Sequence, residues 1–253
     1  MDGNLKTAAV YDIHGNLPAL EAVLAEADKS GVDVFVIGGD VVTGPMSGQC
    51  LDRLSEIRKP VHFIKGNCEV HVLDYSEHKK LRPLPEQVLK DIKWTSEQLS
   101  HIQRDFIKKW SMTVKINTGS YGEILFCHAV PENENDIFTK LTPESDLLPL
   151  FENLNVNTVV CGHTHMQFDR NIGKVRVINA GSVGMPFGKS GAYWLLLGNE
   201  PELKFTEYDL QTASRRIMQT GYLFADDFVK KHLLNPPSEE EMLALFSTAD
   251  KYF

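Results

Sequence analysis

The chain has 253 residues, which is long enough to bury one large hydrophobic core. Its 26 Lys and Arg residues face 34 Asp and Glu residues, and the net charge of -8 argues against a grip on duplex nucleic acid that depends on counterion release. Met1 to Lys6 show no signal-peptide pattern and no apolar run approaches the roughly 18 residues of a membrane span, so we expect a cytoplasmic protein without membrane insertion.

Strand and helix signals alternate through the first half of the chain. Apolar residues at helical spacing occupy 17–27 and 47–57, and each segment lies between two apolar runs rich in β-branched and aromatic residues. Helical spacing returns between about Leu84 and Trp110, where we predict a helical insertion over about 78–110 that covers one end of the sheet. This order predicts an α/β protein that begins with a β-α-β unit.

The second half of the chain begins with hairpin signals. From Thr113, apolar runs alternate with turns such as Asn171-Ile172-Gly173-Lys174, so we expect a largely antiparallel or mixed sheet. We predict a helical C-terminal appendage over about 211–253, whose last helix begins at a capping box of Ser238 and Glu241. No repeat or low-complexity linker interrupts the chain, which predicts a single domain over residues 1–253.

Five short polar blocks each follow a strand-like apolar run. The runs are 8–11, 34–37, 61–64, 124–126 and 158–160, and the blocks behind them are Asp12-Ile13-His14, Gly39-Asp40, Gly66-Asn67-Cys68-Glu69, Cys127-His128 and Gly162-His163-Thr164-His165. Ligand groups gather where the carboxyl ends of strands meet, and a core does not tolerate this many polar groups without partners. We therefore predict one metal-bearing active site.

The spacing inside the blocks suits metal coordination. Alternate residues of an extended segment point the same way, so Asp12 and His14 can bind one ion together, and His163 and His165 repeat that spacing. A carboxylate such as Asp40 can bridge two cations. Mixed oxygen and imidazole ligation favours Mn, Fe, Zn, Ni or Co over calcium.

The series D-x-H, G-D, G-N-[HC]-[DE], H and G-H-x-H resembles the calcineurin-like metallophosphoesterase superfamily, from about Lys6 to Val183. The resemblance implies a two-sheet β-sandwich flanked by helices and a dinuclear centre of divalent transition-metal ions, with Mn first and Fe, Ni, Co or Zn as alternatives. It also implies that a hydroxide shared by the two ions attacks phosphorus. The implied ligands are Asp12, His14 and His165 for one ion, Asn67, His128 and His163 for the other, and Asp40 as the bridge.

Two departures from the family pattern bear on the substrate. Protein phosphatases and symmetrical diadenosine tetraphosphatases of the superfamily usually carry an Arg shortly after the bridging Asp, whereas Asp40 is followed here by Val41-Val42-Thr43-Gly44-Pro45. The missing guanidinium makes both of these assignments less favoured. Cys68 stands where most members place a histidine thought to protonate the leaving oxygen or stabilise the transition state. Because a thiol is the poorer acid, we expect esters with good leaving groups to be preferred.

Cysteine at that position also occurs in the small prokaryotic phosphodiesterase branch of the superfamily. The segment Asn179-Ala180-Gly181-Ser182 resembles the N-x-G-S loop of the same branch, in which the loop lies near the metals. We therefore assign the chain to this branch and expect a site role for the loop.

Several other residues allow two interpretations. His71 is an alternative acid, although a plain surface histidine is the simpler interpretation. Glu69 either orients a metal-binding histidine or caps a helix. We interpret Lys189 as a solvated loop lysine, and Trp94 and Trp110 as packing residues rather than platforms for a nucleobase.

These features predict a metal-dependent hydrolase of phosphoric esters, with Asn67, Cys68 and His128 as candidate catalytic residues. Our preferred hypothesis is a phosphodiesterase or broad-specificity phosphatase that acts on a small phosphate ester, with nucleotides among the candidate substrates. The alternatives are a dinucleoside polyphosphate hydrolase, a Ser/Thr protein phosphatase and, in another class, a non-catalytic metal-binding scaffold. The sequence leaves the oligomeric state open.

Overall fold

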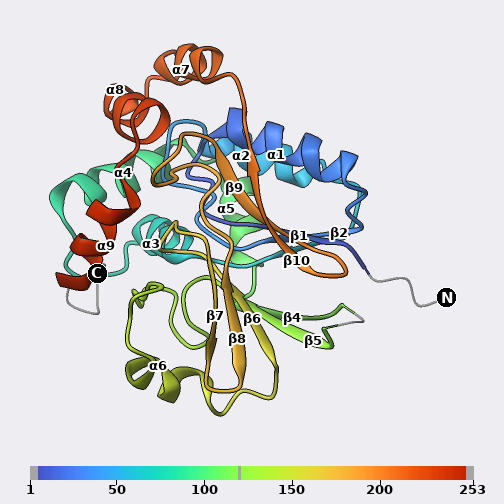
Figure 1. Cartoon of the computed structure of the whole chain (residues 1–253). Coiled ribbons are helices and arrows are strands. Elements are labelled where there is room, and N and C mark those ends of the chain that lie inside the picture. The colour runs from blue at the N-terminus through green and yellow to red at the C-terminus, as the bar shows by residue number, and fades with distance from the viewer. Residues whose placement is uncertain (1–4, 119–120, 249–253) are drawn as a thin grey trace.

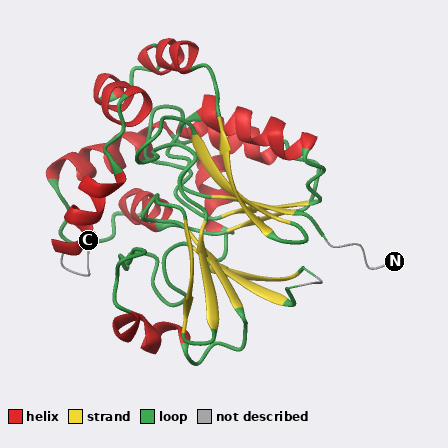
Figure 2. Ribbon diagram, viewed as in Figure 1, coloured by secondary structure: helices red, strands yellow, loops and turns green. Residues whose placement is uncertain are grey.

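Two five-stranded β-sheets lie face to face, and helices cover the outer face of each sheet (Figure 1). The computed structural model describes residues 5–118 and 121–248. Figure 2 shows the strands as two central layers, with α1 (Leu17–Lys29) over one sheet and α6 (Glu144–Phe151) beneath the other.

The first sheet has the strand order β10-β9-β1-β2-β3. Its strands are β1 (Thr7–Val10), β2 (Val34–Ile37), β3 (Val61–Phe63), β9 (Ala192–Leu197) and β10 (Pro201–Thr206). The β1, β2 and β3 strands run parallel, as the predicted β-α-β start requires, whereas β9 and β10 extend the sheet with antiparallel pairing.

The second sheet has the order β4-β5-β6-β8-β7 and is mixed, in agreement with the expectation for this half of the chain. Its strands are β4 (Thr113–Asn117), β5 (Glu123–Cys127), β6 (Thr158–Cys161), β7 (Phe168–Ile172) and β8 (Val175–Asn179). The three central strands, β5, β6 and β8, are parallel, and the two edge strands pair antiparallel.

Alternate side chains of each strand divide between an inner and an outer core. In β1, Ala9 packs between the two sheets, whereas Ala8 and Val10 face the helices above. In β5, Phe126 lies between the sheets and Leu125 packs in the cluster that α6 covers. The predicted two-sheet sandwich flanked by helices is therefore confirmed.

The helices lie on the outer faces and along the edge where the strands end. They are α1, α2 (Ser47–Ser55), α3 (Asn67–Ser76), α4 (Glu86–Gln98), α5 (His101–Lys108), α6, α7 (Leu210–Met218), α8 (Ala225–Phe228), the π-helix η1 (Val229–Leu234) and α9 (Glu239–Thr248). None of these helices of the described chain is long and apolar enough to cross a membrane.

The two segments predicted to be helical differ in detail from the expectation. The region over about 78–110 contains α4 and α5, but residues 79–85 are not helical and form a loop between α3 and α4. In the tail, Ser238 and Glu241 form the predicted capping box, with a distance of 2.8 Å from Ser238 N to the Glu241 carboxylate. Residues 249–253 lie outside the described residues, and the domain boundaries stay predictions.

Candidate metal centre

The loops that follow five strands bring all seven predicted metal ligands to one place. The residues that follow β1, β2, β3, β5 and β6 in the chain are Asp12 and His14, Asp40, Asn67, His128, and His163 and His165. Ligand atoms of six of these residues fall into groups of three whose members lie within 4.8 Å of one another. Two carboxylates, one amide and four imidazoles therefore lie together at one edge of the sandwich.

The backbone is strained at most of these residues. Five of the seven have a positive φ: Asp12 (54°), His14 (45°), Asp40 (51°), His163 (66°) and His165 (58°). This left-handed conformation is uncommon for residues other than glycine and costs of order 1–3 kcal/mol each, so it persists only where the surroundings enforce it. Such clustering of strain is typical of a functional site.

Close packing of the backbone explains the glycines in the motifs. A Cβ atom on Gly162 would lie 2.5 Å from Asp12 Oδ2, and one on Gly39 would lie 2.8 Å from His128 Nδ1. Both separations are shorter than atoms in contact allow, so a side chain at either position would displace a predicted ligand. Glycine at these positions lets the loops approach one another closely.

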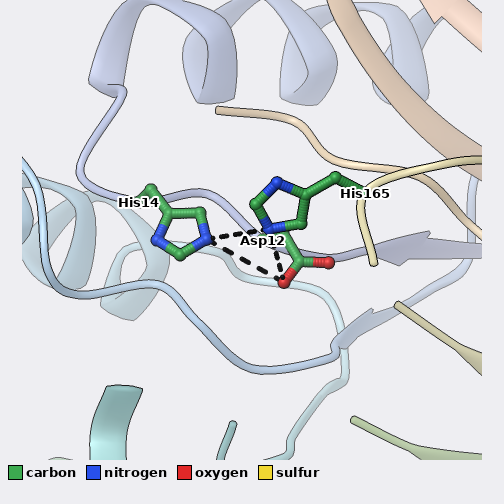
Figure 3. Close-up of side chains that lie close together, drawn as sticks. All are labelled: Asp12, His14 and His165. Carbon is green, nitrogen blue, oxygen red and sulfur yellow. Dashed lines mark hydrogen bonds and ion pairs between the residues drawn. The ribbon is translucent and has the colours of Figure 1, made fainter. Parts of the chain in front are cut away.

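Asp12, His14 and His165 form one subsite (Figure 3). His14 Nε2 lies 3.1 Å from His165 Nε2, and Asp12 Oδ1 lies 3.5 Å from His165 Nε2 and 4.0 Å from His14 Nε2. Asp12 Oδ1 is buried and accepts no hydrogen bond from the residues that the structure describes. Three ligand atoms that face one point, one of them buried without a donor, fit a cation.

Asn67, His128 and His163 lie around a second point. His128 Nε2 lies 3.1 Å from Asn67 Oδ1, and the rings of His128 and His163 are 5.0 Å apart. Asp40 stands between the subsites, since its Oδ1 is 3.5 Å from His128 Nε2 and its Oδ2 is 3.8 Å from His14 Nε2. The two oxygens of one carboxylate therefore face different histidine clusters.

Hydrogen bonds to backbone carbonyls orient three of the histidines. His128 donates through Nδ1 to Gly38 O at 2.9 Å and His165 through Nδ1 to Met185 O at 2.8 Å, so Nε2 is the nitrogen of each ring that faces the other predicted ligands. His163 has the opposite arrangement, because its Nε2 donates to Asn135 O at 3.2 Å while its buried Nδ1 has no hydrogen bond within the described residues. A fixed tautomer with one free nitrogen is the arrangement found in metal-binding histidines.

The electrostatics of the cluster favour ionised carboxylates. Burial by itself would raise the pKa of Asp40, but His128, His14 and His163 outweigh burial and hold that pKa well below its ordinary value. Burial, and then the charge of His128, lower the pKa of His163 to about 4. For His128, burial acts downward, but Asp40 and Asp12 raise its pKa to about 10. A cation bound beside Asp40 would have to displace the His128 proton.

Glu69 holds the backbone that carries Asp40. Its fully buried carboxylate accepts four backbone N–H groups: Asp40 N and Gly66 N to Oε2, both at 2.8 Å, and Val41 N and Val42 N to Oε1 at 2.8 and 3.1 Å. The bond from Gly66 is the helix cap foreseen as one of two roles, and no hydrogen bond from Glu69 to a histidine is present among the described residues. Glu69 therefore acts on the ligand loops through their backbone.

The loop that resembles N-x-G-S braces two of the ligand segments. Asn179 Nδ2 donates to Gly162 O at 2.7 Å, beside His163, and Ser182 Oγ donates to Asp12 O at 2.8 Å. Both side chains are fully buried. The loop lies against the ligand segments and acts on their backbone.

A cavity of about 560 Å³ opens over the cluster. His14, Asp40, Asn67, His163 and His165 line its polar side, together with Cys68. Cys68 Sγ donates to Asp40 Oδ2 at 3.1 Å, so the residue at the expected acid position also touches the predicted bridging carboxylate. The apolar part of the lining consists of Pro83, Leu84, Pro85, Val88, Ile92 and Met185.

Sequence reasoning did not identify Arg82 as a residue of this cavity, and it misjudged His71. Arg82 lines the cavity from the loop between α3 and α4, and no motif marked it. The interpretation of His71 as a surface residue was wrong: only 6% of it is exposed, and it also lines the cavity. Helical spacing from Asn67 to His71 is the signal that places both on one face of α3.

The plainer interpretations of the remaining candidates agree with the structure. Lys189 is exposed and pairs with Glu207 at 2.7 Å. Trp110 is buried and stacks on Phe63 with ring centroids 4.9 Å apart. Trp94 packs edge-on against Tyr222.

Asp91 on α4 should make the free energy of unfolding depend on pH. Burial raises the pKa of Asp91 to about 6, although Tyr222 and Thr95 donate hydrogen bonds to it. A raised folded-state pKa means that its stabilising contribution is fully present below pH ~4 and is lost as the pH rises through ~6, about 3 kcal/mol in total. We expect the unfolding free energy of the wild type to fall by about that amount relative to Asp91→Asn between pH 4 and 7. Urea titrations measure this difference, and a constant gap between the two proteins would contradict the assignment.

The helix-flanked double sheet, with Asp, Asn and His gathered at its strand ends, is the arrangement of a metal-dependent phosphoesterase. The model of the calcineurin-like phosphoesterase superfamily domain matches residues 5–199 of the chain. The chain therefore belongs to the calcineurin-like phosphoesterase superfamily, as the motifs indicated, and is an enzyme of the metallophosphoesterase type. The family implies divalent metal ions, and the clusters around Asp12 and Asp40 are the candidate ligand groups.

Comparison with known proteins extends this likeness over most of the chain. The chain is 27% identical over 206 residues to phosphodiesterase YfcE of Escherichia coli K12, covering 78% of this chain and 89% of that protein. Its fold is similar to that of hypothetical protein PH1004 of Pyrococcus horikoshii OT3, with a TM-score of 0.75 at 19% identity over 92% of this chain and 99% of that one. A metallophosphoesterase from Sphaerobacter thermophilus gives a TM-score of 0.70 at 19% identity, over 89% and 97% of the chains.

Proposed function

We propose that the chain hydrolyses small phosphodiesters, or a broader range of small phosphate esters, at a dinuclear metal centre. One observation carries the proposal: the two oxygens of Asp40 face different clusters, with His128 Nε2 at 3.5 Å and His14 Nε2 at 3.8 Å. In this proposal Asp40 is the bridge. One ion takes Asp12, His14 and His165, and the other takes Asn67, His128 and His163.

Divalent ions bound at these residues would supply Lewis-acid stabilisation of the phosphoryl oxygens and acidify a water molecule at neutral pH. The contribution of the chain is to hold its ligands in place before substrate arrives. Backbone carbonyls orient His128, His163 and His165, and Glu69 and the Asn179 loop hold the segments on which the ligands stand. Mn is our first choice of metal, with Fe, Ni, Co or Zn as alternatives, since the ligands mix oxygen with imidazole nitrogen.

The size and lining of the cavity support a small phosphate ester whose alcohol part is apolar. The cavity volume of about 560 Å³ lies within the range of ordinary small-molecule sites, roughly 300–1,000 Å³, and its lining combines the predicted ligands with apolar residues. Phosphodiesterase YfcE, the relative named above, carries that activity in its name and supports the diester preference. A nucleotide is one candidate, because a base can pack on an apolar wall.

The rival functions have less support. The segment Val41-Val42-Thr43-Gly44-Pro45 after Asp40 lacks the Arg that protein phosphatases and symmetrical diadenosine tetraphosphatases usually carry there, so no guanidinium from this segment can bind a phosphate. A non-catalytic scaffold would not need all seven ligand positions, and every one is occupied by a residue able to bind metal. The cytoplasmic location stays a prediction from the sequence.

Assays of the metal-reconstituted protein test the proposal. The protein should be stripped of metal, loaded separately with Mn, Co, Ni or Fe, and assayed on an aryl phosphodiester and the matching aryl phosphomonoester. We expect turnover of both esters, with the diester preferred. Absence of turnover with every metal would contradict the proposed function.

Cys68→His should widen the range of esters that the enzyme hydrolyses. Cys68 contacts the predicted bridge Asp40, and imidazolium is a better proton donor than a thiol at neutral pH. General acid catalysis contributes about 100-fold or more, and it matters most where the leaving group is poor. We therefore expect kcat on an alkyl phosphate to rise at least about tenfold, with little change on an aryl ester. Equal rates for variant and wild type on the alkyl ester would count against this role.

A further inference from the structure

We propose that Arg82 binds a phosphate oxygen of the substrate and that His71 positions it for this purpose. The inference rests on the proposed function, because it concerns the ester that the metal centre would hydrolyse. Arg82 would supply, from the loop between α3 and α4, a guanidinium of the kind that this chain lacks after Asp40.

Arg82 is the sole Lys or Arg among the described residues that line the cavity over the ligands. It is half-buried, and no described carboxylate lies within ion-pair distance of it. Burial lowers the pKa of Arg82, and Glu134 opposes this effect from farther away. A partly desolvated cation without a counterion favours an anion beside it.

The guanidinium of Arg82 is held at one end and free at the other. Its Nε donates to His71 Nε2 at 3.2 Å, whereas neither terminal nitrogen donates a hydrogen bond to any described residue. Two free, parallel donors of a guanidinium match two oxygens of a phosphate. The geometry therefore leaves the anion-binding part of the side chain available.

His71 links Arg82 to the ligand cluster. Asn67 and His71 are four residues apart in α3 and lie on the same face, about one helical turn apart. Both line the cavity, as does Cys68. His71 thus ties Arg82 to the helix that carries Asn67, and in this proposal it acts as a positioning residue.

The phosphate in question is either the scissile group or a second phosphate joined to it. Both present the same anionic oxygens, so the test includes a ligand of each kind. Inorganic phosphate and AMP represent the first, and ADP represents the second.

The test compares Arg82→Gln and Arg82→Lys with Lys80→Gln, using Mn-loaded protein. Lys80 is an exposed cation two residues away that does not line the cavity, so it controls for the loss of charge. Calorimetric titration gives the dissociation constants of the three ligands, and an aryl phosphodiester gives KM and kcat. If Arg82 binds the scissile phosphate, Arg82→Gln should weaken the binding of phosphate and AMP by about 10- to 100-fold; if it binds a second phosphate, only the binding of ADP should weaken by that amount. In both cases we expect KM to rise and the metal content to stay unchanged.

Arg82→Lys should keep part of the affinity for these ligands, since lysine retains the positive charge but not the two parallel N–H donors of the guanidinium. His71→Leu should also weaken phosphate binding, and this effect should vanish in the Arg82→Gln background because His71 acts through Arg82. If His71 were instead a general acid, its loss would lower kcat in both backgrounds, most strongly on poor leaving groups.

Unchanged affinity for all three ligands in Arg82→Gln, or an equal loss in Lys80→Gln, would overturn the inference. So would a wild-type protein that binds none of the ligands. A wild type that binds one of these ligands through Arg82 without hydrolysing any ester would contradict the proposed function alone. Normal hydrolysis by Arg82→Gln, with unchanged affinity for all three ligands, would contradict this inference alone.

Discussion

Asp40→Asn should reduce kcat/KM about a thousandfold or more, because a lost metal removes several kcal/mol of transition-state stabilisation and each ~1.4 kcal/mol corresponds to about tenfold in rate. The amide keeps the size of the side chain but offers one oxygen in place of two. In the structure the two oxygens of Asp40 face His128 and His14 separately, so the substitution should affect both ions. Metal content and steady-state kinetics of the variant give the answer.

Asp105→Asn is a suitable control for this experiment. Asp105 is exposed on α5 and makes a long ion pair of 3.7 Å with Lys108. The control therefore replaces a carboxylate by an amide away from the cavity. Surface substitutions of this kind are usually within ~0.5 kcal/mol, which is about twofold in rate. An Asp40→Asn protein with full metal content and activity close to that of the control would show that Asp40 is not the bridge.

Glu69→Gln should destabilise the protein by about 4 kcal/mol although it changes only one atom. The two oxygens of Glu69 each accept two backbone N–H groups, so in either amide orientation the new NH₂ group faces two donors. Each buried donor left without an acceptor costs about 1–3 kcal/mol. The measurement is the free energy of unfolding in urea at pH 8, above the pKa of about 7 to which burial, and then Asp40, raise this carboxyl.

The chain offers a matched control for Glu69 in an exposed capping box. Glu241 occupies the same position relative to Ser238 as Glu69 does relative to Gly66, but it is solvated at the start of α9. Glu241→Gln should destabilise the protein far less than Glu69→Gln, because water can replace the lost acceptor. Because the Asp40 backbone depends on Glu69, we also expect Glu69→Gln to weaken Mn binding about 10- to 100-fold. Equal stability losses in the two variants would mean that the buried network is not the cause.

The sequence predicted the fold and the gathering of the seven residues because both depend on local patterns. Continuous apolar runs rich in β-branched and aromatic residues identify the strands, and a polar block behind each run must lie at the carboxyl end of its strand. Asp12, Asp40 and His128 could therefore be placed together without any long-range information. The D-x-H and G-H-x-H spacings then limited the chemistry to a metal site.

Arg82 and its contact with His71 could not be predicted in this way. The loop over residues 79–85 has no periodic pattern, and its contact with α3 depends on how α4 packs, which is a tertiary effect. The tail gives a similar example: Phe187 stacks on His165 with centroids 5.4 Å apart, and Phe246 of α9 packs on Phe187. Neither contact has a signature in the sequence around it.

The most direct test of the dinuclear centre is a calorimetric titration of the metal-free protein with Mn²⁺. The arrangement around Asp40 predicts two ions per chain, and both should depend on the Asp40 carboxylate. Binding of a single ion per chain, or of none, would contradict the account of this protein as a two-metal phosphoesterase.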